Sequence, residues 1–159
     1  MSTSLTYELT YDAPVADVAR MLSDPEFRKA VCDAQRALSR SVTVTGTTES
    51  GSVSIEYSQA ASGIPSFARK IVGDTIDIVQ REEWSDNRAT VDIVIPGKPG
   101  ETSGTVTLTE SGGVTVERVA VEIRVNVPLV GGKVERLIQD VLVRAFKKEN
   151  QVGREWLAR

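Results

Sequence analysis

Histidine is absent from the 159-residue sequence, and cysteine occurs only once, as Cys32. Without an imidazole the chain cannot build a Ser-His-Asp or Cys-His catalytic site, a histidine general base, or a metal site that needs histidine. A single thiol forms neither an internal disulfide nor a thiolate metal cluster. We therefore predict no metal and no cofactor, and we expect Cys32 to be a small buried residue.

Long apolar runs and an excess of basic residues are also missing. No stretch approaches the roughly 18 apolar residues that a membrane-spanning helix needs, and the N-terminus lacks the basic and apolar regions of a signal peptide. Nineteen Lys and Arg against 22 Asp and Glu give a net charge of −3, which argues against binding nucleic acid through phosphate neutralisation. We predict a cytoplasmic protein with no integral membrane segment and no nucleic-acid partner.

Stiff, β-branched side chains dominate what is present, with 22 Val, 9 Ile and 14 Thr against 9 Leu. Such side chains pack well on a pleated sheet, so the composition favours strands. Hydrophobic residues make up 40% and charged residues 26%, which is ordinary for a globular protein. No linker or internal repeat divides the chain, so we expect one domain over residues 1–159.

Periodicity predicts one strand, two short helices and about six further strands. Apolar and polar residues alternate over residues 5–11, as in a half-buried strand. Residues 12–14 and 23–25 each combine Asp with Pro, a combination typical of a helix start. From Ser41 to Val127 the period is mostly two, interrupted by turn residues and by one helix-like turn after Pro65.

A long amphipathic helix of roughly 25 residues is predicted at the C-terminal end. After Gly131 apolar side chains recur every three or four residues, which makes a stripe wide enough to face a core. An antiparallel sheet of this size cannot leave its apolar face against water. The C-terminal helix is therefore the obvious element to cover it.

The strand that precedes this helix changes parity along its length. Val114 and Val116 alternate out of step with the apolar positions from Val119 onward, so we expect a β-bulge near Glu117-Arg118. The charged residues of this strand are expected to face solvent; they are Glu117, Arg118, Glu122 and Arg124. If the bulge swaps the parity, an inward Arg would anchor a carboxylate.

Two segments resemble the helix-grip fold of the START-like superfamily, also called Bet v 1-like or SRPBCC. The first runs from Tyr11-Asp12-Ala13-Pro14 to Leu22-Ser23-Asp24-Pro25-Glu26-Phe27, and the second is Val127-Pro128-Leu129-Val130-Gly131-Gly132-Lys133-Val134-Glu135. Within the superfamily, the chain is similar over nearly its whole length to the family catalogued as domain of unknown function 2505.

The resemblance implies an α+β fold in which a curved antiparallel sheet of about seven strands wraps around a long C-terminal helix. Two short helices would follow the first strand. The resemblance also implies a cavity between sheet and helix, which in relatives holds lipids, sterols, polyketides or plant hormones. Some members of the superfamily are cyclases or dehydratases.

Inward positions of the predicted strands and the apolar face of the last helix would line any such cavity. The predicted ligand-binding residues are Tyr57, Phe67, Ile78, Trp84, Ile93, Val106, Ile123, Leu137, Val141 and Leu142. The same side chains would serve equally well as a filled core, because both situations use the same residue types. No catalytic residue is assigned.

The segment Ala60–Gly73 has two interpretations. Gly63 and Gly73 flank an apolar stretch that carries the basic pair Arg69-Lys70, which suits a flexible lid over the mouth of a cavity. An ordinary connection containing one amphipathic turn would have the same composition.

Three functions stay open. We predict a protein that binds or carries a small hydrophobic ligand, lipid or polyketide-like; the alternatives are a polyketide cyclase or aromatase-like enzyme and a protein-interaction module with a filled core. Tyr57, an inward Arg and a carboxylate meeting in one pocket would favour chemistry. A uniformly apolar lining would favour carriage, and the absence of histidine favours binding over catalysis.

Overall fold

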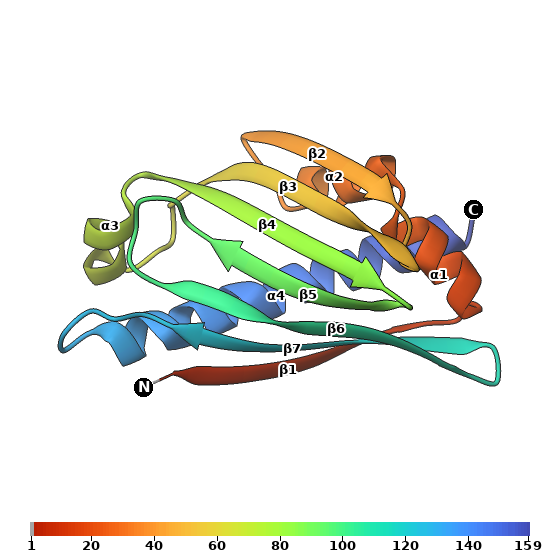
Figure 1. Ribbon diagram of the computed structural model, residues 1–159. Coiled ribbons are helices and arrows are strands. Elements are labelled where there is room, and N and C mark those ends of the chain that lie inside the picture. The colour runs from red at the N-terminus through yellow and green to blue at the C-terminus, as the bar shows by residue number, and fades with distance from the viewer. Residues whose placement is uncertain (1) are drawn as a thin grey trace.

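A computed structural model describes residues 2–159 as a seven-stranded antiparallel sheet with four helices (Figure 1). In chain order the elements are β1 (Thr3–Tyr11), α1 (Val15–Leu22), α2 (Pro25–Ala34), β2 (Ser39–Gly46), β3 (Ser50–Ala60), α3 (Ser66–Val72), β4 (Thr75–Ser85), β5 (Arg88–Val94), β6 (Glu101–Ser111), β7 (Val114–Arg124) and α4 (Gly131–Leu157). The strand order is β1-β7-β6-β5-β4-β3-β2, so β1 and β2 are the sheet edges. The predicted α+β helix-grip architecture is confirmed.

Local chemistry explains where several of these elements begin and turn. The Asp24 carboxylate accepts a hydrogen bond of 2.9 Å from the backbone N–H of Glu26, and Pro25 occupies the first position of α2. Both features stabilise a helix N-terminus. Gly112 and Gly113 join β6 to β7 with φ of 59° and 80°, values that a tight two-residue hairpin turn requires.

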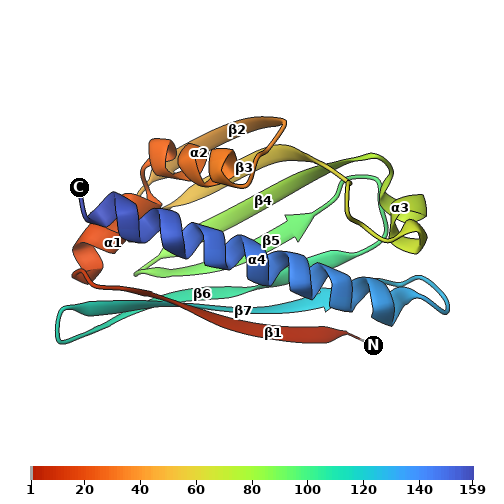
Figure 2. The same cartoon turned by 180° about the vertical axis from the view of Figure 1, so that it is seen from behind.

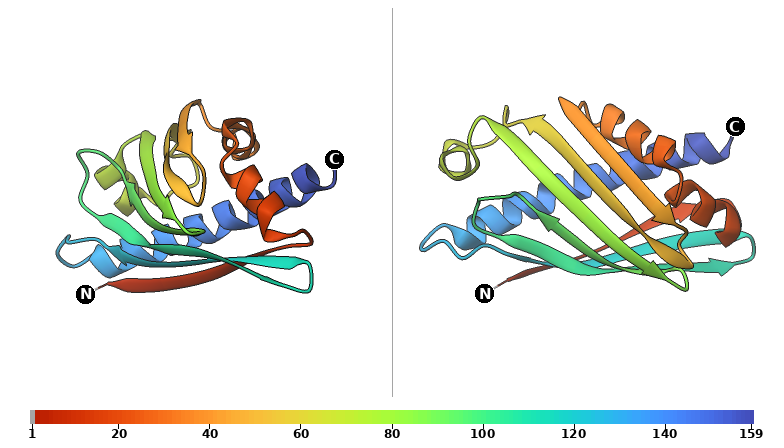
Figure 3. Two further views of the ribbon diagram at one scale, coloured as in Figure 1. Left: turned by 45° about the vertical axis from the view of Figure 1, so that its right-hand side comes forward. Right: turned by 45° about the horizontal axis from the view of Figure 1, so that its top comes forward.

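Helix α4 crosses the concave face of the sheet (Figure 2). The strands curve around it, as Figure 3 shows from two directions. Helices α1 and α2 lie at the C-terminal end of α4, whereas α3 lies at the end where α4 begins (Figure 2). The space between sheet and α4 is therefore covered by different elements at its two ends.

The end near α1 and α2 is close-packed. Leu22 and Phe27 are fully buried there, and the Phe27 and Trp156 rings meet edge to face with 5.6 Å between centroids. Gly153 of α4 lies so close to the buried Tyr11 ring that a Cβ atom at this position would be 2.6 Å from Tyr11 Cε1. Glycine lets helix and sheet approach more closely here than any other residue would allow.

The expected bulge in β7 is wrong. Glu117 is paired in unbroken register with both Leu9 of β1 and Leu108 of β6. Glu117 shares the parity of Val119 and is buried with it, at 4% exposure. Because one face of an antiparallel sheet meets solvent and tolerates scattered apolar residues, Val114 and Val116 lie on the outer face without any bulge.

The inward charge of β7 is therefore the Glu117 carboxylate, so the expectation that Glu117 faces solvent is wrong. The alternative of an inward Arg depended on the bulge, and Arg118 and Arg124 both lie exposed. The charged residues of this strand that do lie exposed, as expected, are Arg118, Glu122 and Arg124.

Candidate functional site

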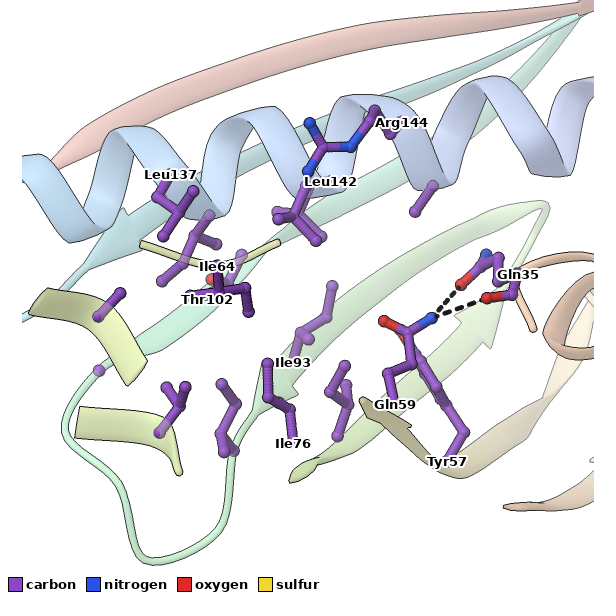
Figure 4. Close-up of a pocket in the computed structure, with 18 of the residues that line it drawn as sticks. Gln35, Tyr57, Gln59, Ile64, Ile76, Ile93, Thr102, Leu137, Leu142 and Arg144 are labelled. Atoms are coloured by element: carbon purple, nitrogen blue, oxygen red, sulfur yellow. Dashed lines mark hydrogen bonds between the residues drawn. The ribbon is translucent and has the colours of Figure 1, made fainter. Parts of the chain in front are cut away.

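A cavity of about 450 Å³ lies between α4 and the sheet, on the side of α3 (Figure 4). Helices α3 and α4, strands β4 and β5, and the loop residues next to α3 and β5 supply aliphatic side chains to its wall. These side chains are Ile64, Ile71, Ile76, Ile78, Ile93, Ile95, Leu137, Ile138, Val141 and Leu142. Most of them are only half-buried, because they border open space rather than other protein atoms.

Six of the ten predicted ligand-binding residues lie along this wall. They are Tyr57, Ile78, Ile93, Leu137, Val141 and Leu142. The remaining four, Phe67, Trp84, Val106 and Ile123, do not line it.

The position of each of these four residues has a geometric reason. Val106 and Ile123 are buried in the layer between sheet and helix, where neighbouring side chains separate them from the void. Trp84 is six residues beyond Ile78 on β4, roughly 20 Å along the strand. Phe67 lies in the first turn of α3, one residue before Ala68, and does not belong to the lining.

The segment Ala60–Gly73 forms one wall of the cavity. Its helix α3 presents Ala68, Ile71 and Val72 to the lining. The Arg69 guanidinium donates a hydrogen bond of 2.9 Å to the carbonyl of Ala61 and so ties α3 to the loop before it. Opening of this segment as a lid stays a prediction.

A second, smaller chamber of about 40 Å³ adjoins the large cavity on the side of α2. The two spaces share lining residues, namely Gln35, Tyr57, Leu142 and Ala145. Figure 4 shows Gln35 and Tyr57 at the side of the large cavity where the chamber adjoins it. The wall of the chamber combines apolar side chains with charged and polar ones, including Arg28, Gln80 and Glu149.

The Arg28 side chain is held by a buried ion pair. Its Nη1 and Nη2 atoms donate to the two carboxylate oxygens of Glu82 at 3.0 and 2.8 Å, and its Nε donates to the Leu22 carbonyl at 2.9 Å. The Glu82 carboxylate also accepts hydrogen bonds from Gln80 Nε2 at 2.6 Å and Trp84 Nε1 at 2.8 Å. This bidentate pairing fixes the guanidinium and the carboxylate in one relative geometry.

Two further carboxyls accompany this pair. Glu117 is buried, and its Oε1 atom has no hydrogen-bond partner within residues 2–159. Burial raises the pKa of Glu117 well above its usual range, and the charge of Glu149 raises it further. Burial also raises the pKa of Glu149 to about 7, against the opposing effect of the Arg28 charge.

The remaining titratable groups near the chamber are neutral at physiological pH. Burial raises the pKa of the Cys32 thiol to about 11, and it raises the pKa values of Tyr11 and Tyr57 above the usual tyrosine value. The Tyr11 hydroxyl has no hydrogen-bond partner in the described part of the chain. Over the same residues, no group of three His, Cys, Asp or Glu side chains is placed to hold a metal ion.

The charged cluster of Arg28, Glu82, Glu117 and Glu149 was not predicted as a site. Strand parity in the sequence could have revealed part of this cluster, because Glu82 alternates in step with the inward Ile78 and Trp84 of β4. A charged residue at an inward position between apolar ones indicates a buried polar group that needs a partner.

The family model described as "Protein of unknown function (DUF2505)" matches residues 6–157. The chain belongs to the DUF2505 family. No curated protein matches its sequence. Among the described residues of this DUF2505 chain, no helix combines the length and the apolar character needed to cross a membrane.

Solved structures with the same fold are distant in sequence. The protein TTHA0849 from Thermus thermophilus is 18% identical, with 98% of this chain and 97% of that chain covered and a TM-score of 0.69. A START superfamily protein from Mycobacterium smegmatis is 13% identical, with 97% and 98% covered and a TM-score of 0.62. Norcoclaurine synthase from Thalictrum flavum, solved with dopamine and hydroxybenzaldehyde, is 16% identical, with 100% and 88% covered and a TM-score of 0.64. At such identities the likeness shows that the DUF2505 chain shares their fold.

Proposed function

We propose that this protein binds or carries a small hydrophobic ligand, lipid or polyketide-like, in the large cavity. The observation that carries the proposal is the ring of half-buried aliphatic side chains around about 450 Å³ of space. A ligand that fills this space removes their apolar surface from water, with a gain of about 0.8 kcal/mol for each buried methylene. That gain exceeds the loss of translational freedom only for a ligand with several such groups.

The surroundings of the cavity fit this role. Exposed charged side chains stand where the lining meets solvent, and three of the four are basic; they are Arg36, Glu101, Arg144 and Lys148. A charged rim keeps an apolar opening soluble when no ligand is bound. We place this role in the cytoplasm, which the single free cysteine, Cys32, suits.

Native mass spectrometry of protein purified from its own host tests the proposal. We expect a copurifying small molecule, and thermal stabilisation of the emptied protein by fatty acids, sterols or aromatic polyketides. Ala145→Trp fills the junction of cavity and chamber and should abolish both effects, whereas Ala16→Trp, on the exposed side of α1, should change neither. A ligand-free mass together with no thermal shift for any of the three classes would contradict carriage.

A cyclase-like enzyme is the second candidate. Two observations favour it. The chamber beside the cavity is lined by Arg28, Tyr57 and Glu149, and norcoclaurine synthase, which by its name is an enzyme, has the same fold. Incubating the recovered ligand or its linear precursor with the protein distinguishes the two roles. Turnover that stops in Glu149→Gln would favour catalysis, and an unchanged ligand mass would favour carriage. The cavity volume speaks against the third function, an interaction module with a filled core.

A further inference from the structure

Around the chamber, carboxyl groups outnumber cations. Among the described residues that line it, Arg28 is the one cation and Glu149 the one carboxyl. Two more carboxyls, Glu82 and Glu117, lie outside the lining, and their charges also act on Arg28. The large cavity beside it is lined mainly by aliphatic side chains. A molecule that extends from one space into the other therefore passes from an apolar environment into an acidic one.

The three carboxyls near Arg28 differ in their hydrogen bonds. Glu82 accepts four hydrogen bonds, two of them from Arg28. Within residues 2–159, the Oε1 atom of the buried Glu117 has no hydrogen-bond partner. Glu149 is half-buried and lines the chamber, and no hydrogen bond to its side chain is formed among these residues. A buried carboxyl oxygen without a partner is unfavourable, so Glu117 lacks a hydrogen-bond donor among these residues, and the nearby Glu149 side chain is free to accept one from a ligand in the chamber.

We propose that the chamber binds the cationic, hydrogen-bond-donating end of an amphipathic ligand, an alkyl- or arylalkyl-ammonium group, with Glu149 as the accepting residue. The hydrocarbon body would lie in the large cavity. This inference rests on the proposed function, because it assigns the class and the orientation of the ligand that the cavity carries.

An ammonium fits the chamber better than a carboxylate. Arg28 already donates three hydrogen bonds, so a ligand carboxylate would compete with Glu82 and add a further negative charge to the cluster. An ammonium group donates hydrogen bonds to carboxyl oxygens, and its positive charge favours their ionised form. About 40 Å³ exceeds the roughly 10–15 Å³ that one water molecule needs, so the chamber admits a small head group but no ring.

Proton release should accompany this binding. The groups facing Glu149 are Arg28 and Cys32 of α2, Tyr57 of β3, Glu82 of β4, Glu117 of β7 and Tyr11 of β1. Burial holds the pKa of Glu149 at about 7, so near neutral pH this carboxyl is partly protonated. An ammonium beside it favours the ionised form, and the displaced proton passes to the buffer.

Displacement of Nile red, a neutral dye, by decylamine, decanol and decanoate at pH 7 provides the test. We expect decylamine to bind about tenfold more tightly than decanoate. Calorimetry in buffers of different ionisation enthalpy should show proton release with decylamine and none with decanol. Glu149→Gln should bring the amine and the carboxylate to within about threefold of each other, while Glu155→Gln, exposed on the same helix, should keep the wild-type preference.

The outcomes separate this inference from the proposed function. Equal binding of the three compounds, or tighter binding of decanoate, would overturn the ammonium site and leave carriage intact. A decanoate preference lost in Arg144→Gln would place the head group at the rim and would also overturn it. Amine binding without proton release, measured on the unaltered protein, would remove Glu149 from the role. If the dye and all three compounds fail to bind, the proposed function itself fails.

Discussion

The two ends of the layer between α4 and the sheet use similar residues and reach opposite results. At the α1 and α2 end, Leu22 and Phe27 are fully buried, and Gly153 is in contact with the Tyr11 ring. At the α3 end, Leu137 and Ile93 face a cavity of about 450 Å³. Aliphatic and aromatic side chains thus form a close-packed core at one end and an open pocket at the other.

The two ends differ in the helices that cover the layer in addition to the sheet and α4. Helices α1 and α2 follow β1 directly and close one end of the layer, whereas the short α3 at the other end reaches the cavity with only a few side chains. Close packing therefore requires enough chain to cover the apolar surface from a third side. Where that chain is missing, the same surface remains available to a ligand.

The largest difference between the two ends is expected when one leucine is truncated at each. Leu22→Ala removes a fully buried side chain and should lower the free energy of unfolding by about 2–5 kcal/mol. Leu137→Ala, on the cavity wall, should lower it by about 1 kcal/mol, because this side chain already borders open space. Urea denaturation measures both. Equal losses would mean that the cavity end is as well packed as the other.

A smaller effect is expected from glycine substitutions at the two ends of α4. Gly153→Ala places a Cβ atom 2.6 Å from Tyr11 Cε1 and should destabilise the protein by about 1–3 kcal/mol. The control is Gly132→Ala, whose Cβ atom would meet only Arg136 Nη1 at 3.9 Å and should be neutral or slightly stabilising. Thermal denaturation of the two variants checks the sign. A stabilising Gly153→Ala would show that α4 shifts freely at its packed end.

The smallest effect concerns how the free energy of unfolding depends on pH through Glu149, which lies between the two ends. Because burial raises the pKa of Glu149 from 4.5 to about 7, the folded state keeps a proton that the unfolded chain releases. The free energy of unfolding therefore decreases as the pH rises between these two values. We expect the wild type to lose roughly 1–2 kcal/mol more than Glu149→Gln over this range, measured by urea denaturation at several pH values. Parallel curves for the two proteins would contradict this burial effect.

Helices and strands could be predicted wherever the sequence pattern depends on residues close together in the chain. The stripe of apolar residues after Gly131 predicted α4, and the Asp24-Pro25 pair predicted the start of α2, because both depend on neighbours within a few residues. Strand parity also gives the set of β7 residues that point inward, and Glu117 belongs to this set. The expected bulge arose from treating Val114 and Val116 as core residues, although an outer sheet face accepts valine.

The site was predictable only in part. Tyr57, Ile93 and Leu142 were expected at the cavity and lie there, because inward parity and the helix stripe define the layer they occupy. The partnership of Arg28 with Glu82 joins residues 54 positions apart, and no local pattern links them.

The amino-acid sequence was enough to establish the period of most elements and to exclude histidine chemistry. These properties follow from residue type and spacing alone. Only the tertiary structure decided that the layer between sheet and α4 is filled at one end and open at the other, and that Glu117 and Glu149 come together with the Arg28–Glu82 pair beside the opening. Void space and buried charge clusters depend on how distant segments pack in three dimensions, and spacing along one chain does not record that packing.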